Sequence, residues 1–196
     1  MRWKLFRKAF PWSKDERKEL PEVNIEGKLI RIREKRVEDI PDEYAWRVDE
    51  ELSRLDATRP LTMSYDDFLR YSKEEMQFPN FRSKRLAVET IEGVHIGNVM
   101  YYDLNMRNAE TELGIMIGNK EYWGKGYGTD IVKTLLKHLF EDLKLERVYL
   151  HTLAWNYRAQ SSFSKSGFRE IRAVRRGGQD FLLMEVYRNS WEEEAT

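Results

Sequence analysis

Apolar residues alternate with polar ones in several stretches of the chain, and this period of two predicts β-strands. In "TELGIMIG" one face carries Leu113, Ile115 and Ile117, while Glu112 lies on the other. Further strands are expected in "KLIRIRE", on both sides of a turn in "RLAVETIEGVHIGNVMYYDL", and in "RVYLHTLA", "FREIRAV" and "DFLLMEVYR". The pattern therefore predicts a sheet of about six to seven strands.

Other stretches place apolar residues three or four positions apart, which predicts helices. These stretches run from Tyr44 to Leu55 after Pro41, from Tyr65 to Phe78, from Ile131 to Leu143, and from Ala159 to Lys165. His138 falls on the predicted polar side of the third helix. Helices inserted between strands favour an α/β (α+β) fold, with a mixed, twisted central sheet flanked by helices on both faces.

Composition indicates one folded domain with short extensions. The chain has 196 residues, 41% of them hydrophobic and 35% charged, which is typical of a globular protein. Basic and acidic residues number 34 each, so no net charge draws the whole protein to a nucleic acid or a membrane. The absence of cysteine excludes disulfides and cysteine nucleophiles and fits a reducing compartment. With no apolar run near the roughly 18 residues of a membrane span, we expect a cytoplasmic protein.

We divide the chain into a basic aromatic arm, 1–27, a domain, 28–190, and an acidic tail, 191–196. The arm interleaves lysines and arginines with Trp3, Phe6, Phe10 and Trp12. We expect it to pack on its own domain or on a second subunit of a homodimer. The alternative is contact with an anionic membrane surface or with RNA.

A glycine-rich loop, "EYWGKGYGTD", joins the strand that ends at Ile117 to the long helix. Glycines let a ligand approach the main chain, and the first turn of a helix offers unpaired N–H groups. The spacing of Gly124, Gly126 and Gly128 fits neither a Walker loop nor a dinucleotide fingerprint. The loop remains a candidate anion site, with simple turn geometry as the alternative.

Two motifs together resemble the GNAT superfamily of N-acetyltransferases, and most closely its branch of ribosomal-protein N-terminal and small-amine acetyltransferases. "WGKGYG" is similar to the phosphate loop of that family, although Trp123 stands where Gln or Arg is commoner. Downstream, "NYRAQSSFSKSGF" is similar to the family's Asn-x-x-Ala/Ser run that ends in Lys-x-Gly-Phe. The resemblance spans roughly Lys28 to Arg188.

The resemblance implies acetyl-CoA as cosubstrate, no metal, and direct transfer of an acetyl group to an amine acceptor, either a protein N-terminus or a small molecule. The implied cofactor-binding residues are Ile117, Gly124, Lys125, Gly126, Tyr127, Gly128, Thr129 and Asn156. The pantetheine arm would pair with the strand Glu112 to Ile117, where that strand diverges from "RVYLHTLA". Glu112 would act as the general base, and the main-chain N–H of Met116 would bind the oxyanion.

The general acid is not identified, because Phe163 stands where many relatives carry a tyrosine. His151, in a strand beside the expected cleft, is an alternative base. Asn156 also suits a helix cap. The alternative to an enzyme is an acyl-CoA-binding regulatory or structural module without turnover, for which Phe163 is the sequence feature. The acceptor is not predicted.

Overall fold

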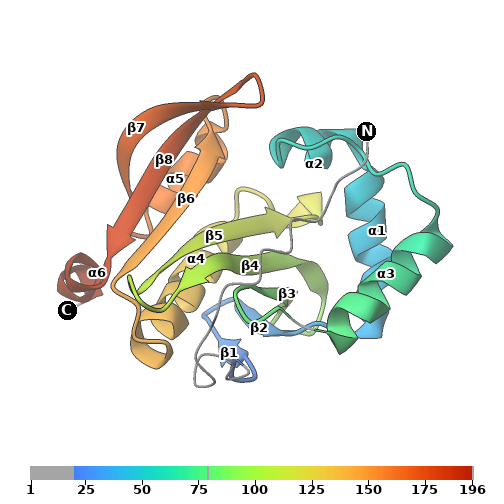
Figure 1. Cartoon of the computed structure of the whole chain (residues 1–196), viewed down its shortest axis with the longest axis horizontal. Helices are drawn as coiled ribbons and strands as arrows, with labels where there is room; N and C mark the ends of the chain where they lie inside the picture. The colour runs from blue at the N-terminus through green and yellow to red at the C-terminus, as the bar shows by residue number, and fades with distance from the viewer. Residues whose placement is uncertain (1–19, 79, 196) are drawn as a thin grey trace.

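The computed structural model describes residues 20–78 and 80–195, with side chains up to Trp191, so most of the predicted arm lies outside the described residues. One mixed sheet forms the domain, with strand order β1-β2-β3-β4-β5-β6-β8-β7 (Figure 1). The strands are β1 (Asn24–Glu26), β2 (Ile30–Glu34), β3 (Lys84–Thr90), β4 (His95–Asn105), β5 (Glu110–Ile117), β6 (Arg147–Leu153), β7 (Arg169–Arg176) and β8 (Gln179–Tyr187). The α-helices are α1 (Ile40–Val48), α2 (Glu50–Leu55), α3 (Tyr65–Gln77), α4 (Tyr127–Lys137), α5 (Tyr157–Ser164) and α6 (Arg188–Ala195). The predicted fold class is confirmed.

The sheet has one strand more than the upper predicted number, because β1 is too short to show a pattern. Its three residues pair antiparallel with β2. Val23, just before it, belongs to the hydrophobic core and is 1% exposed. The chain therefore enters the folded domain before residue 28, inside the segment that we assigned to the arm.

The helical stretch expected from Tyr44 to Leu55 is two helices, so the prediction of one continuous helix was wrong. Asp49 has an extended backbone, with φ −69° and ψ 125°, and ends α1. Its carboxylate accepts a hydrogen bond from the N–H of Leu52 at 2.8 Å and so caps α2. A short polar side chain that can bond its own main chain outweighs the apolar periodicity here.

The strands β5 and β6 diverge, as predicted from the resemblance. They are parallel and pair at Glu110↔Arg147, Thr111↔Val148 and Glu112↔Tyr149. On its other side β5 pairs antiparallel with β4 as far as Ile117. Within the described residues, one edge of 113–117 thus has no strand beside it, and this opening positions the site.

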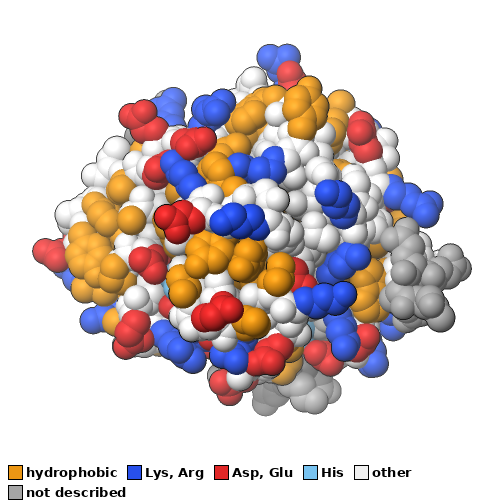
Figure 2. All heavy atoms as spheres, turned by 180° about the vertical axis from the view of Figure 1, so that it is seen from behind, with side chains coloured by type: hydrophobic (Ala, Val, Ile, Leu, Met, Phe, Trp, Pro, Cys, Tyr) orange, Lys and Arg blue, Asp and Glu red, His pale blue; other side chains and the backbone are white. Residues whose placement is uncertain are grey.

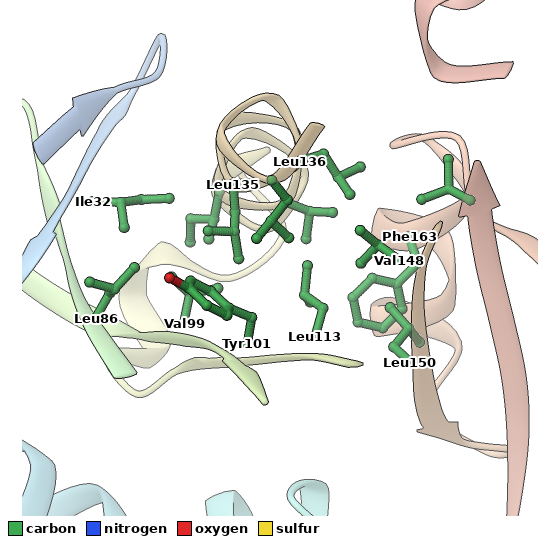
Figure 3. Packing of buried hydrophobic residues seen from close by; sticks show 14 of the residues in the cluster. Ile32, Leu86, Val99, Tyr101, Leu113, Leu135, Leu136, Val148, Leu150 and Phe163 are labelled. Atoms are coloured by element: carbon green, nitrogen blue, oxygen red, sulfur yellow. The ribbon is translucent and has the colours of Figure 1, made fainter. Parts of the chain in front are cut away.

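Helix α4 covers one face of the sheet, and the N-terminal helices lie on the opposite side of the strands (Figure 3). Its apolar face, which includes Leu135 and Leu136, packs toward Tyr101 and Leu113 in the core. The helix continues as a π-helix, His138–Asp142. This wider turn buries His138, which is 4% exposed, so its predicted position on a polar face was wrong.

The predicted acidic tail, 191–196, is largely helical, because α6 runs to Ala195. Trp191 packs on Phe140, with the ring centroids 5.5 Å apart. Over the face seen from behind, acidic and basic side chains are interspersed (Figure 2), in keeping with the zero net charge. Among the described residues, the structure has no helix long and apolar enough to cross a membrane.

Candidate active site

Two cavities adjoin where β5 and β6 diverge. The larger has a volume of about 900 Å³ and the smaller about 270 Å³. Both are lined by Leu55, Asp56, Ile115, Asn156, Ala159 and Phe163. A ligand in the smaller cavity can therefore meet a ligand in the larger one across these shared residues.

The smaller cavity collects most of the residues that the sequence assigned to cofactor binding. They are Ile117, Gly124, Gly126, Gly128, Thr129 and Asn156, together with Met116. Lys125 does not line this cavity and is exposed. Tyr127 does not line it either, and its ring packs edge-on against Tyr122 at 5.0 Å.

The glycine-rich loop leaves the first turn of α4 open. Gly124 and Gly126 have φ values of 71° and 91°, a region that glycine adopts without strain. Gly126 is the N-cap of α4 and supplies no side-chain cap. The nearby carboxylate of Asp130 accepts hydrogen bonds from the N–H groups of Lys28 and Leu29, at 3.1 and 2.8 Å, instead of capping α4. Free N–H groups at a helix N-terminus favour an anion.

A cation stands beside this loop. The guanidinium of Arg158 lies 3.5 Å from the ring centroid of Trp123. The ring is held in place because its Nε1 donates a hydrogen bond to the carbonyl of Ile117 at 2.7 Å. Arg158 and Lys165 line the smaller cavity, and within the described part of the chain Arg158 forms no salt bridge. Sequence reasoning missed both cations and considered Lys125 instead; the only sequence signal was their place in "NYRAQSSFSK".

Asn156 begins α5 and caps it, as predicted. Its side-chain oxygen accepts a hydrogen bond from the N–H of Ala159 at 3.3 Å. The same residue lines both cavities. Capping and contact with a ligand are therefore compatible roles.

A buried carboxylate and an imidazole meet in the larger cavity. Oε1 of Glu112 lies 2.7 Å from Nδ1 of His151, and each side chain is 8% exposed. Tyr102 lies directly opposite Glu112 on β4, so that the charge of the carboxylate acts on its hydroxyl. All three residues line the larger cavity. The sequence singled out Glu112, gave His151 as an alternative, and missed Tyr102.

Two tyrosines beside Glu112 remain protonated hydroxyls. Burial raises the pKa of Tyr102 above its ordinary value, and the nearby charge of Glu112 raises it further. Burial and the charge of Glu112 also raise the pKa of Tyr149, which neighbours Glu112 on β6. Their hydroxyl groups are therefore available as hydrogen-bond donors near Glu112.

Phe163, at the position where the resemblance implies a tyrosine, lines both cavities. Phe163 is 6% exposed and packs against Phe168, with ring centroids 5.9 Å apart. It is apolar and cannot donate a proton. Among the described residues, no group of three or more histidines and carboxylates is arranged to hold a metal ion.

Comparison with protein families agrees with this geometry. Residues 30–169 match the model of the acetyltransferase (GNAT) domain. The chain is 30% identical over 100 residues to a probable spermine N(1)-acetyltransferase from Bacillus subtilis subsp. natto. That alignment covers 48% of this chain and 66% of the relative, just under two thirds of its length. A putative ribosomal N-acetyltransferase, YdaF, from Bacillus subtilis is 28% identical over 132 residues, with 61% of this chain and 72% of the relative aligned.

Solved structures have the same fold at low sequence identity. The spermidine N-acetyltransferase from Vibrio cholerae in complex with CoA and spermine superposes with a TM-score of 0.73 at 20% identity. It covers 83% of this chain, and this chain covers 98% of it. RimJ from Mycobacterium smegmatis in complex with CoA-disulfide gives a TM-score of 0.70 at 16% identity, with coverages of 85% and 88%.

Proposed function

The chain belongs to the GNAT acetyltransferase family, and from this premise we propose that it transfers an acetyl group from acetyl-CoA to a primary amine. The observation that carries the proposal is the pair of adjoining cavities. The smaller has the open helix N-terminus and two cations, which suit a diphosphate. The larger holds the polar cluster around Glu112. Phe163 and Asn156 line both, so the thioester and the amine meet beside them.

In this proposal the pyrophosphate of acetyl-CoA binds to main-chain N–H groups between Gly124 and Thr129, with Arg158 and Lys165 adding positive charge. The bound thioester supplies an activated acetyl carbon. The unpaired edge of β5 offers main-chain groups to the pantetheine amides, because hydrogen-bonding groups of the backbone require partners. Sequence reasoning assigned the oxyanion to the N–H of Met116, and we keep that assignment as part of the proposal.

The amine must lose a proton before or during its attack on the thioester. We assign this step to the buried pair of Glu112 and His151, which lies 2.7 Å apart in the larger cavity. Tyr102, opposite Glu112 on β4, lies beside this pair. Direct attack requires no covalent intermediate on the protein.

The charges of the larger cavity favour an acceptor that is not a polycation. Each carboxylate that lines it already has a cationic or imidazole partner: Glu34 with Lys84 at 2.6 Å, Asp56 with Arg47 at 2.9 Å, Glu75 with Arg85 at 3.6 Å, and Glu112 with His151. Lys35, which is itself paired with Glu43 at 2.6 Å, and Arg176 line it as well. A polyamine needs uncompensated carboxylates, so similarity to spermine acetyltransferases does not by itself make spermine the acceptor here.

The test is turnover with a panel of primary amines, measured as thiol released from acetyl-CoA together with acetylated product. The panel contains peptides with free N-termini, monoamines and polyamines. We expect product from at least one amine that carries a single positive charge. Tight binding of acetyl-CoA without product from any amine would instead support an acyl-CoA-binding module without turnover, and absence of binding would refute both.

A further inference from the structure

We infer that Nε2 of His151 is the atom that takes the proton from the acceptor amine, and that Glu112 is a positioning residue. This inference rests on the proposed function and assigns the roles within its proton-transfer pair. It differs from the sequence-based expectation, in which Glu112 itself was the base. The assignment changes because Oε1 of Glu112 is engaged by the imidazole, whereas Nε2 of His151 is open.

The hydrogen bond between the two residues fixes the imidazole tautomer. An ionised carboxylate can only accept a hydrogen bond, so the proton between Oε1 of Glu112 and Nδ1 of His151 is carried by the ring. The lone pair of the neutral ring is then on Nε2. In the described part of the chain Nε2 of His151 has no hydrogen-bond partner. This atom keeps some exposure to solvent, unlike Nε2 of His95 and Nε2 of His138, which are fully buried. Because His151 lines the larger cavity, we place its open Nε2 toward that cavity.

The carboxylate is already engaged. Oε1 of Glu112 accepts the imidazole N–H, and the residue is 6% exposed. This bond occupies Oε1 and leaves the carboxylate to orient the ring. An imidazole oriented by a carboxylate through Nδ1, with Nε2 toward the substrate, is the arrangement in which histidine acts as a general base.

The other groups near the ring do not take over this role. Tyr149, two residues before His151 on β6, lies edge-on at 6.2 Å between ring centroids, and its raised pKa keeps it protonated. On β8 the residue opposite His151 is Leu183, which is apolar. Asp56 lines the same cavity and is held by Arg47. Among these groups, the imidazole of His151 is thus the one that can accept a proton from the amine.

The proposed step balances as follows. An ammonium acceptor first loses one proton to Nε2, which passes it to solvent. The neutral nitrogen attacks the thioester carbon, the N–C bond forms, and the C–S bond breaks. Nε2 takes the second proton from nitrogen and returns it to the thiolate sulfur, which yields the amide and free CoA thiol. The imidazolium thereby supplies the proton that Phe163 cannot donate.

Two substitutions distinguish the roles, with kcat/KM measured against pH. His151→Asn keeps a hydrogen-bond donor near Glu112 but removes the basic nitrogen, so we expect kcat/KM to fall about 100-fold or more. The rise of kcat/KM with pH near neutrality should disappear in this variant. Glu112→Gln should lower kcat/KM about tenfold and keep that rise, because the His151 imidazole is still present. Added imidazole should restore part of the activity of His151→Ala.

The matched control is His138→Asn. His138 has the same Nδ1-to-carboxylate distance, 2.7 Å to Asp142, and lines neither of the two cavities. Its variant should keep the wild-type rate and pH profile. The inference is refuted if His151→Asn keeps the neutral-range rise while Glu112→Gln loses it, or if the wild type shows no such rise. Wild-type protein that acetylates no amine would refute the proposed function itself, and thermal unfolding of each variant separates loss of fold from loss of chemistry.

Discussion

Glu112 and Tyr149 form the last residue pair that joins β5 to β6. Neighbouring strands of a sheet normally run about 4.8 Å apart along their length. Here the ladder ends at this pair, while β5 continues to Ile117 and, among the described strands, pairs there only with β4. The same position therefore ends the pairing, exposes one edge of β5, and puts a carboxylate at the start of the opening. Glu112 thus ends the pairing of β5 with β6 and also lines the larger cavity, where we place the proton transfer.

We predict that Gly126→Ala weakens binding of acetyl-CoA by about tenfold or more. Gly126 has a φ of 91°, which costs an alanine about 1–2 kcal/mol, and relief of that strain would move the first turn of α4. A steric clash is not the cause, since the nearest described atom to an added Cβ is Cδ1 of Leu29, at 3.9 Å. Isothermal titration with acetyl-CoA measures the effect.

Gly93→Ala is the control for this substitution. Gly93 has a φ of 87° and nothing within 4 Å of an added Cβ, and it lies in the turn between β3 and β4. Both variants should lose similar unfolding free energy, but Gly93→Ala should bind acetyl-CoA normally. Equal affinity in the two variants would show that the main chain of the loop does not hold the ligand.

We predict that Arg158→Gln raises the KM for acetyl-CoA about fivefold to tenfold. A charge-assisted hydrogen bond to an anion contributes about 1.5–3 kcal/mol, and exposure of Arg158 to solvent reduces this. The wild-type KM should also increase with ionic strength more steeply than that of the variant. Steady-state kinetics at two salt concentrations provide the measurement.

Arg54→Gln is the matched control, because Arg54 also lies over a tryptophan. Its guanidinium is 4.6 Å from the ring centroid of Trp155, and it lines neither of the two cavities. Loss of a cation–π contact alone should therefore leave the KM for acetyl-CoA unchanged. A similar rise in both variants would mean that Arg158 acts through the stacking rather than through its charge.

Much of the fold follows from periodicity, because alternation marks seven of the strands and a 3.6-residue period marks α3, α4 and α5. The pattern failed where local or tertiary interactions outweighed it. Asp49 breaks a helix with its own side chain, and the π-helix turns His138 inward. β1 has three residues, fewer than a period needs to become visible.

The candidate site was predicted unevenly for a similar reason. The glycine loop, Asn156 and Glu112 lie in motifs that are contiguous in sequence. Tyr102 reaches Glu112 from β4, and His151 reaches it from β6, 39 residues further along the chain. Such a cluster depends on strand register, and a one-residue shift would have turned either side chain to the opposite face.

We predict that Arg47→Gln raises activity toward spermine relative to a monoamine of similar length. Arg47 pairs with Asp56 at 2.9 Å, and Asp56 lines both cavities. Removing the arginine leaves a carboxylate free to attract a second amine, whereas the wild type should prefer the monoamine. The ratio of kcat/KM values for the two amines measures the change. A wild-type preference for spermine, or a ratio unaffected by the substitution, would contradict the charge argument.

We predict that Asp39→Asn lowers the unfolding free energy at pH 7 by about 2–4 kcal/mol, because it breaks a buried ion pair. Both carboxylate oxygens of Asp39 accept hydrogen bonds from Arg33, at 2.8 Å each.

Burial alone would raise the pKa of Asp39, but the bonds from Arg33 and one from the N–H of Arg36 hold it below its ordinary value. A lowered pKa adds stability above the unfolded value of about 4, and this stability is lost as the pH falls below it. Urea unfolding at pH 7 and pH 3 should therefore show a smaller difference for Asp39→Asn than for the wild type. Glu26→Gln, at an exposed pair with Arg31, should change stability by less than about 0.5 kcal/mol; an equal effect of the two substitutions would contradict the prediction.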